Sequence, residues 1–460
     1  MKKEKERQSM EHQQGDRVFY RKMFFIGIPV VFQNLISIGL NLIDTLMIGM
    51  IGEQELAAVG AANQVYFIFT VSLFGLYSGA AVYTAQYFGA KDIAGVRKML
   101  GIDYAVGAVF AGVVSVAAFI FAPKIIWLFS KDATVIEFGV RYIRIACFSY
   151  IFSGISSAIS YNSRAIQNLK VPTIINAAAL CVNAVLNYLL IFGIGVFPEM
   201  GVQGAATATL IARVFEFCAL LTYIYTRKSH PFKAGPSDLF SFDRNHFVRV
   251  MKTAVPVVFT EGGWSVSVAM IFAAYGLLGT SALAVAQVAN VVCEMLQSAY
   301  FGVGNATAML IGENLGQGEK DRAYRNGKLS IRAVWILNVV MTIAMLFLAR
   351  PIASVYNFSG ETGELLVKAL MTMAILLTPK MLGYMYIVGI LRAGGDTVFC
   401  MYLELGTNLF IQVPVAYFAV LVLHTSLPLA MILVELGAIV RIGLSVPRFR
   451  SRKWINIVTD

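Results

Sequence analysis

The sequence predicts an all-α membrane protein whose roughly twelve transmembrane helices form two pseudo-symmetric six-helix bundles. Composition gives the first reason: 58% of the 460 residues are hydrophobic and 14% are charged, whereas about a quarter of the residues in a soluble domain are charged. Apolar segments of about 20 residues, long enough to cross a bilayer as helices, also recur along the chain. The third reason is that the sequence of the first half is repeated in the second.

The first bundle is predicted over residues 23–226 and follows a charged cytoplasmic tail, residues 1–22. The tail lacks the short apolar core and small-residue cleavage site of a signal peptide, so the first apolar segment is expected to direct membrane insertion. The predicted spans of this bundle, with ends accurate to a few residues, are 23–48, 56–87, 100–122, 134–159, 171–192 and 203–226.

A polar cytoplasmic linker, residues 227–250, is expected next, because its HPFKAGPSD stretch is the least apolar part of the chain between the tails. The second bundle is predicted over residues 251–446, and a basic cytoplasmic tail follows at 447–460. The predicted spans of the second bundle are 252–276, 283–312, 329–349, 366–390, 398–422 and 427–446.

Basic residues gather in alternate loops, and the positive-inside rule assigns those loops to the cytoplasm. One such loop carries Lys91 and Arg97, and others carry Arg164 and Arg392. The opposite loops, such as residues 278–282, carry almost no basic residues. We therefore expect a multi-pass protein of the plasma membrane with both termini in the cytoplasm.

The two halves align without a gap over a long stretch. The PVVF sequence that begins at Pro29 recurs at Pro256, which sets an offset of 227 residues, and Arg164 meets Arg392 after one added residue. An even number of helices per repeat keeps both copies in the same orientation, related by an axis along the membrane normal. This organisation is typical of secondary transporters, in which substrate binds between two lobes and is exposed to one side at a time.

The sequence lacks the residues that several other classes of protein require. The five cysteines lie singly in apolar segments and the four histidines lie in loops or tails, so neither a disulfide framework nor a zinc site is expected. The net charge of +11 comes without a basic patch interleaved with aromatics, so we expect no nucleic-acid partner. No GxxxxGK[ST] phosphate loop is present, so energy would come from an ion gradient rather than from ATP.

The run at residues 29–44, PVVFQNLISIGLNLID, carries unusual polar groups for a transmembrane helix. Gln33 and Asn34 lie midway and are candidates for a cavity wall, and Asp44 lies near the outer end. Ionisable groups at membrane depth are costly and by default mark functional sites.

Three more polar residues are predicted at the depth of Asp44. Asn187 lies about five residues from the outer end of its helix, Asn183 lies one turn deeper on the same face, and Thr209 lies about six residues inside the next helix. A carboxylate with two amides and a hydroxyl can bind a hard cation through oxygen, or can take up and release a proton. Asn183 and Asn187 could instead serve only to hold helices together.

The second half carries a predicted charged cluster near the midplane. Glu261, Glu294 and Lys380 all fall there, and a buried lysine keeps its proton only beside a carboxylate. We expect Lys380 to pair with Glu261 or Glu294, and the other carboxylate to meet a proton or a cationic substrate; a purely structural ion pair is the alternative. Glu404 and Glu435 lie nearer helix ends and are expected to be structural or to line a wet cavity.

Several motifs together resemble the MATE family of multidrug and toxic compound extrusion transporters, and the likeness covers nearly the whole chain outside the tails. They are Pro29, IDTLMIGMIG at 43–52, LAAVG at 56–60, YFGAKD at 87–92, GVQGAATAT at 201–209 and LRAGGDT at 391–397.

The resemblance implies the MATE-type fold and a coupling-cation site at Asp44, Asn183 and Asn187. Members of the family carry either an Asp or an Asn at the position of Asn187. Because this chain has the Asn, Asp44 is the one carboxylate of the site, which favours H⁺ over Na⁺. Na⁺ binding at these three residues stays possible. Glu261 matches a family glutamate, but the family's helix 10 aspartate falls near Met381, beside Lys380, which argues against a sodium site in the second half.

The expected function is therefore secondary antiport: export of amphipathic organic cations or drugs in exchange for H⁺ or Na⁺, by alternating access of two lobes. The alternative is a flippase for a lipid-linked sugar of the same superfamily, for which basic groups such as Arg141, Arg144 and Lys380 would be needed. We expect no enzymatic activity, no firm metal site and no cofactor. The expected protein is a monomer in lipid that acts on small molecules.

Overall fold

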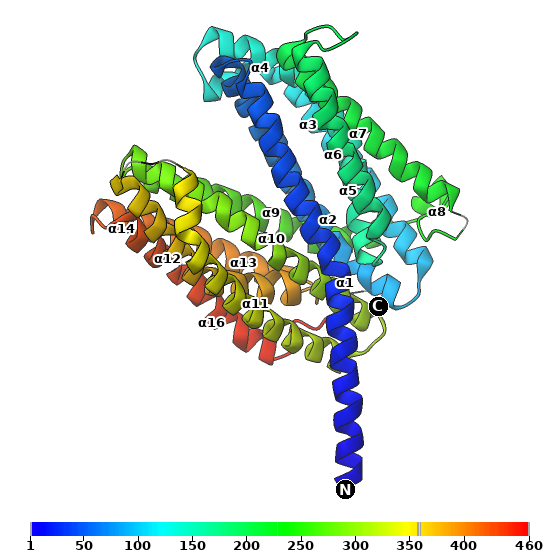
Figure 1. Ribbon diagram of the computed structural model, residues 1–460. Coiled ribbons are helices and arrows are strands. Elements are labelled where there is room, and N and C mark those ends of the chain that lie inside the picture. Colours follow the sequence, from blue (N-terminus) through cyan, green and yellow to red (C-terminus); the bar gives the residue numbers. More distant parts are fainter. Residues whose placement is uncertain (1, 228, 357, 359, 459–460) are drawn as a thin grey trace. The chain divides into compact units, whose positions relative to one another are not determined.

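The computed structural model describes residues 2–227, 229–356, 358 and 360–458. This part of the chain is almost entirely helical and contains no strand (Figure 1). Eleven helices are long and apolar enough to cross a membrane, and a bent helix pair makes a twelfth span. The predicted fold class and the predicted number of spans are confirmed.

In the first half, one predicted span is formed by two helices. α4 and α5 meet at Cys147 with a bend of 47°, where the sequence predicts a single span at 134–159. The other helices extend beyond their apolar segments, because hydrogen-bonded helical turns continue into the polar residues on either side. The helices of this half are α1 (Lys2–Gly49), α2 (Glu53–Gly89), α3 (Ile93–Phe129), α4 (Ala133–Ala146), α5 (Phe148–Ala165), α6 (Lys170–Phe192), α7 (Gly201–Thr226) and α8 (Pro236–Leu239).

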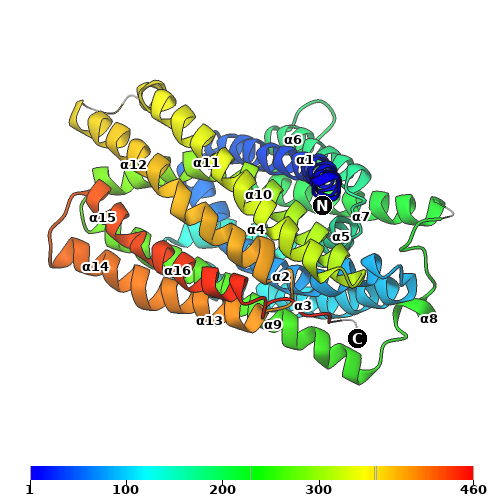
Figure 2. The same cartoon turned by 90° about the horizontal axis from the view of Figure 1, so that it is seen from below.

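In the second half, two spans contain π-helical turns. The backbone N–H of Arg392 donates to the carbonyl of Ile387, five residues back, at 2.8 Å, and this wider turn rotates the residues that follow it. α10, α11 and α12 lie side by side (Figure 2). The elements are α9 (Arg244–Gly276), α10 (Thr280–Gly316), α11 (Lys320–Val355), α12 (Gly360–Tyr384), η1 (Met385–Leu391), α13 (Thr397–Thr407), η2 (Asn408–Gln412), α14 (Val413–Leu421), α15 (Leu427–Val434) and α16 (Leu436–Arg450).

The chain forms two compact units, and it passes from one to the other inside two helices. Unit 1 comprises Met1–Val31 and Val255–Asp460, and unit 2 comprises Phe32–Ala254. α1 and α9 therefore each contribute to both units, and their prolines, Pro29 and Pro256, lie within three residues of the crossing points. The predicted bundles begin at residues 23 and 251 instead, and the residues expected to form a tail are the first turns of α1.

α1 and α9 each make a close backbone contact near the residue at which they cross from one unit to the other. A Cβ on Gly302 of α10 would lie 2.7 Å from the carbonyl oxygen of Gly27 in α1, within unit 1. In unit 2, a Cβ on Gly79 of α2 would lie 2.5 Å from the Cα of Ala254 in α9. Small residues of this kind let transmembrane helices approach closely. Gly27 lies two residues before Pro29, and Ala254 lies two residues before Pro256. The two helices therefore cross between the units at equivalent positions of the repeat.

The linker packs onto unit 2. Phe232 and Leu239 join the buried cluster that contains Val96 and Leu220. His230, outside the membrane spans, is buried, and both this burial and the charge of Arg227 lower its pKa. A neutral ring results, and its Nδ1 accepts a hydrogen bond from the Phe232 backbone N–H at 3.2 Å.

Candidate functional site

In unit 2, Asp44 receives hydrogen bonds from two asparagines one turn apart on α6. The Asn187 amide donates to Asp44 Oδ1 at 2.8 Å. The Asn183 amide, in the orientation that satisfies its neighbours, donates to Oδ2 at 2.9 Å and accepts from the Thr209 backbone N–H at 3.2 Å. α1, α6 and α7 thus bring the four residues of the predicted coupling site together.

One buried atom beside Asp44 is unsatisfied. Asn187 is 2% exposed, and its Oδ1 has no hydrogen-bond partner among the described residues. Buried acceptors are costly when unpaired, so this atom can accept from a proton donor such as a protonated Asp44 or a water molecule. The site has the atoms to stabilise the carboxyl group in either protonation state.

A guanidinium lies within electrostatic range of Asp44. Arg213 of α7 acts on the carboxylate from one side and donates to Glu216 Oε2 at 2.8 Å on the other. Glu216 is 4% exposed, and the Arg213 side chain is 21% exposed. The amide nitrogens that contact Asp44 are donors rather than metal ligands, and the charge of Arg213, which Glu216 partly balances, adds to the cost of placing a metal cation there.

A chain of hydrogen bonds continues from Glu216 to the far end of α5. Asn176 donates to Glu216 Oε1 at 2.8 Å, Gln33 donates to Asn176 at 3.1 Å, and Arg164 donates to Gln33 Oε1 at 3.0 Å. Gln33, predicted as a cavity residue, is thus a member of this chain, while its neighbour Asn34 is half-buried. The chain connects the surroundings of Asp44 to an arginine in the last turn of α5.

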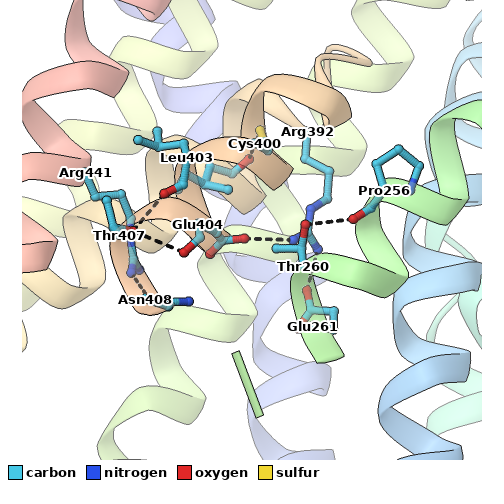
Figure 3. Close-up of polar contacts among 11 residues, drawn as sticks. Pro256, Thr260, Glu261, Arg392, Cys400, Leu403, Glu404, Thr407, Asn408 and Arg441 are labelled. Atoms are coloured by element: carbon cyan, nitrogen blue, oxygen red, sulfur yellow. Dashed lines mark hydrogen bonds and ion pairs between the residues drawn. The ribbon is translucent and has the colours of Figure 1, made fainter. Parts of the chain in front are cut away.

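In unit 1, Arg392 is the cation that contacts Glu261. Its Nη1 donates to Glu261 Oε1 at 2.9 Å, and its Nη2 lies 3.5 Å from Glu404 Oε2. Figure 3 shows the guanidinium between the two carboxylates. The prediction that Lys380 pairs with Glu261 or Glu294 is therefore wrong for Glu261. Arg392 lies in the loop after η1, as expected, but its side chain is buried. Arg392 directly follows the π turn of η1.

The three residues of the predicted charged cluster lie in different surroundings. Glu294 is exposed and accepts from Asn290 at 2.8 Å, one turn earlier on α10. Lys380 lines a cavity together with Glu435 and Arg441. The cluster is thus replaced by an ion group at Arg392 and a separate cavity at Lys380.

Two arginines hold the first helix of each repeat in the same way. Arg164 contacts Gln33 and Arg392 contacts Glu261, and both pairs are separated by 131 residues. The two arginines are the ones that the repeat aligns. Each therefore ties the end of the fourth helix of its repeat to the first helix, shortly after the proline.

Several buried ionisable residues had no predicted role as functional groups. A carboxylate at Asp103 accepts from Asn162 at 2.6 Å in the interior of unit 2 and is 1% exposed. Each of these residues is a charged residue inside or at the end of an apolar segment, which is the signal that identifies Asp44. They include Asp103, Glu216, Arg392, Glu404 and Arg441.

A duplicated helical membrane protein with buried carboxylates and arginines in each repeat belongs to the class of secondary transporters. The sequence model of the MatE family matches residues 29–189 and 256–418, one copy in each half. The chain belongs to this family of multidrug efflux transporters, as its motifs predict.

The similar proteins include transporters of several bacteria. The chain is 27% identical over 441 residues to the "Probable multidrug resistance protein NorM" of Bradyrhizobium diazoefficiens, with 92% of each chain covered. It is 24% identical over 402 residues to the "Probable multidrug resistance protein YoeA" of Bacillus subtilis, with 86% of each covered. Its fold matches the outward-facing conformation of a multidrug resistance MATE family transporter with a TM-score of 0.85 at 18% identity, covering 94% of this chain and 96% of that one.

Proposed function

We propose that the protein is a proton-coupled antiporter that exports amphipathic organic cations by alternating access. The hydrogen-bonded group around Asp44 carries the proposal, because it holds one titratable carboxyl in the interior of unit 2. The protein would lie in the plasma membrane with both termini in the cytoplasm, as the basic loops indicate. The printed names of the relatives, multidrug resistance proteins, support the substrate class.

The choice of H⁺ over Na⁺ follows from the charges near Asp44. A sodium ion would have to displace two amide N–H donors and would meet a single carboxylate, Asp44, because Glu216 is already paired with Arg213. A proton needs no such rearrangement, since it binds to a carboxylate oxygen and can be shared with Asn187 Oδ1.

The proton gradient supplies enough energy for export. One charge that moves across 100 mV releases about 2.3 kcal/mol, and one pH unit adds about 1.4 kcal/mol. Together these terms sustain a gradient of roughly a few hundred-fold for a neutral solute. For a monovalent cation exchanged for one proton the charge term cancels, and one pH unit sustains a gradient of about tenfold. Export of a membrane-permeable drug against this gradient is feasible without ATP.

The test is efflux of a fluorescent organic cation from vesicles that contain the purified protein, with the proton and sodium gradients imposed separately. We expect transport with a proton gradient alone and none with a sodium gradient alone. Glu53→Gln, which neutralises an exposed carboxylate at the start of α2, is the matched control and should transport as the wild type does. Transport with sodium alone would contradict proton coupling, and no transport with either gradient would contradict the substrate class.

A further inference from the structure

α6 and α7 pack against each other in unit 2, and polar side chains follow their contact over several turns. At one level Asn183 donates to Asp44 and accepts from the backbone N–H of Thr209. Arg213 follows Thr209 by four residues, so it lies one turn further along the same face of α7. The charge of Arg213 therefore lies one helical turn from the residues that surround Asp44, and it acts on that carboxyl group.

Arg213 is held by Glu216, which is itself held from two sides. The guanidinium donates to Glu216 Oε2 at 2.8 Å, and the Asn176 amide donates to Oε1 at 2.8 Å. Asn176 in turn accepts from Gln33 at 3.1 Å, and Gln33 lies on the same helix as Asp44. Both carboxylate oxygens of Glu216 are thus engaged, and α1, α6 and α7 together fix the position of its negative charge.

The Arg213–Glu216 ion pair does not hold two helices together. Its two residues lie three positions apart on α7, and pairs with this spacing stabilise a helix by only about 0.2–0.5 kcal/mol. Burial of Glu216, which is 4% exposed, costs more than such a pair returns. A purely structural role therefore gives a weak reason for placing this carboxylate in the interior of unit 2.

The charges that act on Asp44 come from this pair. Asparagine is uncharged and tyrosine is neutral at pH 7, so the other groups around the carboxyl contribute only dipoles and hydrogen bonds. The polar and titratable groups that face Asp44 or Arg213 are Asn183 and Asn187 of α6, Thr209, Arg213 and Glu216 of α7, Tyr142 of α4 and Tyr66 of α2.

We propose that Glu216 is a positioning residue for proton exchange: it holds Arg213 and partly balances its charge, and so sets the pH at which Asp44 releases its proton. A nearby cation favours the ionised form of a carboxyl group, and a nearby anion opposes this effect. With Glu216 in place, Asp44 binds a proton more tightly than it would beside Arg213 alone. The inference rests on the proposed function, because it assumes that Asp44 carries the exchanged proton.

The test measures proton release by the purified full-length protein in weakly buffered detergent solution when tetraphenylphosphonium is added. A pH dye follows the release at a series of starting pH values. The cation can displace a proton only from protein that still carries one, so the release falls as the starting pH rises through the midpoint for Asp44. Asp44→Asn should release no proton, which identifies the source.

Glu216→Gln should move this midpoint about one pH unit below that of the wild type, because the charge of Arg213 is then unbalanced and stabilises the Asp44 carboxylate. The glutamine keeps the shape of the side chain and can still accept from Asn176. Arg213→Gln should move the midpoint in the opposite direction, because Asp44 then faces the negative charge alone, and Arg213→Lys should restore it. Glu199→Gln, which neutralises an exposed carboxylate in the loop before α7, should leave it unchanged.

Shifts of opposite sign could not result from misfolding. If Arg213→Gln does not fold, the double variant with Glu216→Gln replaces it, and its midpoint should lie above that of Glu216→Gln. A wild-type midpoint in Glu216→Gln, or shifts of the same sign in both single variants, would overturn the inference and leave the proposed function standing. Absence of proton release by the wild type, or full release by Asp44→Asn, would contradict the proposed function itself.

Discussion

Asn187 stands where a second carboxylate would complete an oxygen-rich cation site beside Asp44. Its amide donates to Asp44 at 2.8 Å, and its own oxygen is buried without a partner in the described chain. A carboxylate at this position could not donate, and two carboxylates in contact share a proton or bind a cation between them. We therefore propose that the identity of residue 187 decides between proton and sodium coupling.

Asn187→Asp is expected to create sodium binding. In the purified variant, the Tm should rise by a few degrees when choline chloride is replaced by sodium chloride, because a ligand that binds only the folded state stabilises it. The wild type should show no such difference. Asn41→Asp, an exposed position on α1 three residues before Asp44, controls for the added charge. The same sodium effect in the wild type would contradict the account, since sodium would then bind without the second carboxylate.

We propose that α1 and α9, the helices that cross between the units, act as hinges during transport. Pro29 and Pro256 each remove a backbone donor, so the carbonyls of Phe25 and Lys252 lose their helical hydrogen bonds close to the crossing points. The missing bonds weaken each helix at a point where a bend would move one unit's helices and leave the other's in place. Other prolines, such as Pro351 of α11, lie within a single unit.

Pro29→Ala is expected to slow transport without loss of stability. Alanine restores a hydrogen bond and is about 3 kcal/mol more favourable than proline in a helix interior, so the Tm should stay the same or rise. The maximal transport rate should fall severalfold because the helix no longer bends easily. Pro351→Ala is the control and should leave the rate unchanged. A rate for Pro29→Ala equal to that of the wild type would exclude α1 as a hinge.

The sequence predicted an element well where hydrophobicity or the spacing of polar residues changes along the chain, and poorly where the segment is uniformly apolar. Apolar length located the spans, and the one-turn spacing of Asn183 and Asn187 placed both against Asp44 as expected. The π turn in MYIVGIL at 385–391 could not be predicted, because a uniformly apolar segment shows no period from which an extra residue could be recognised. Arg392 lies in the loop that directly follows that turn, as expected, but its burial against Glu261 was not predicted.

The two halves of the molecule share the arrangement of their helices, but they differ in their buried ionisable residues. The equivalent residues Gly27 and Ala254 each make a close backbone contact, and the equivalent residues Arg164 and Arg392 each contact the first helix of their repeat. The coupling group around Asp44 has no counterpart, since the repeat places Ile271 at that position. The repeat did not predict that α1 and α9 are divided between the two units. Sequence similarity indicates which segments are equivalent, but it does not indicate which unit each segment joins.

The most direct test of proton exchange follows the lumenal pH of sealed vesicles with a trapped dye while an organic cation is added outside, with no gradient imposed. If substrate and proton are exchanged at Asp44, the cation should drive protons in the opposite direction, and Asp44→Asn should abolish this proton movement while Glu53→Gln retains it. A proton flux that persists in Asp44→Asn, or cation transport by the wild type without any proton flux, would contradict the central claim.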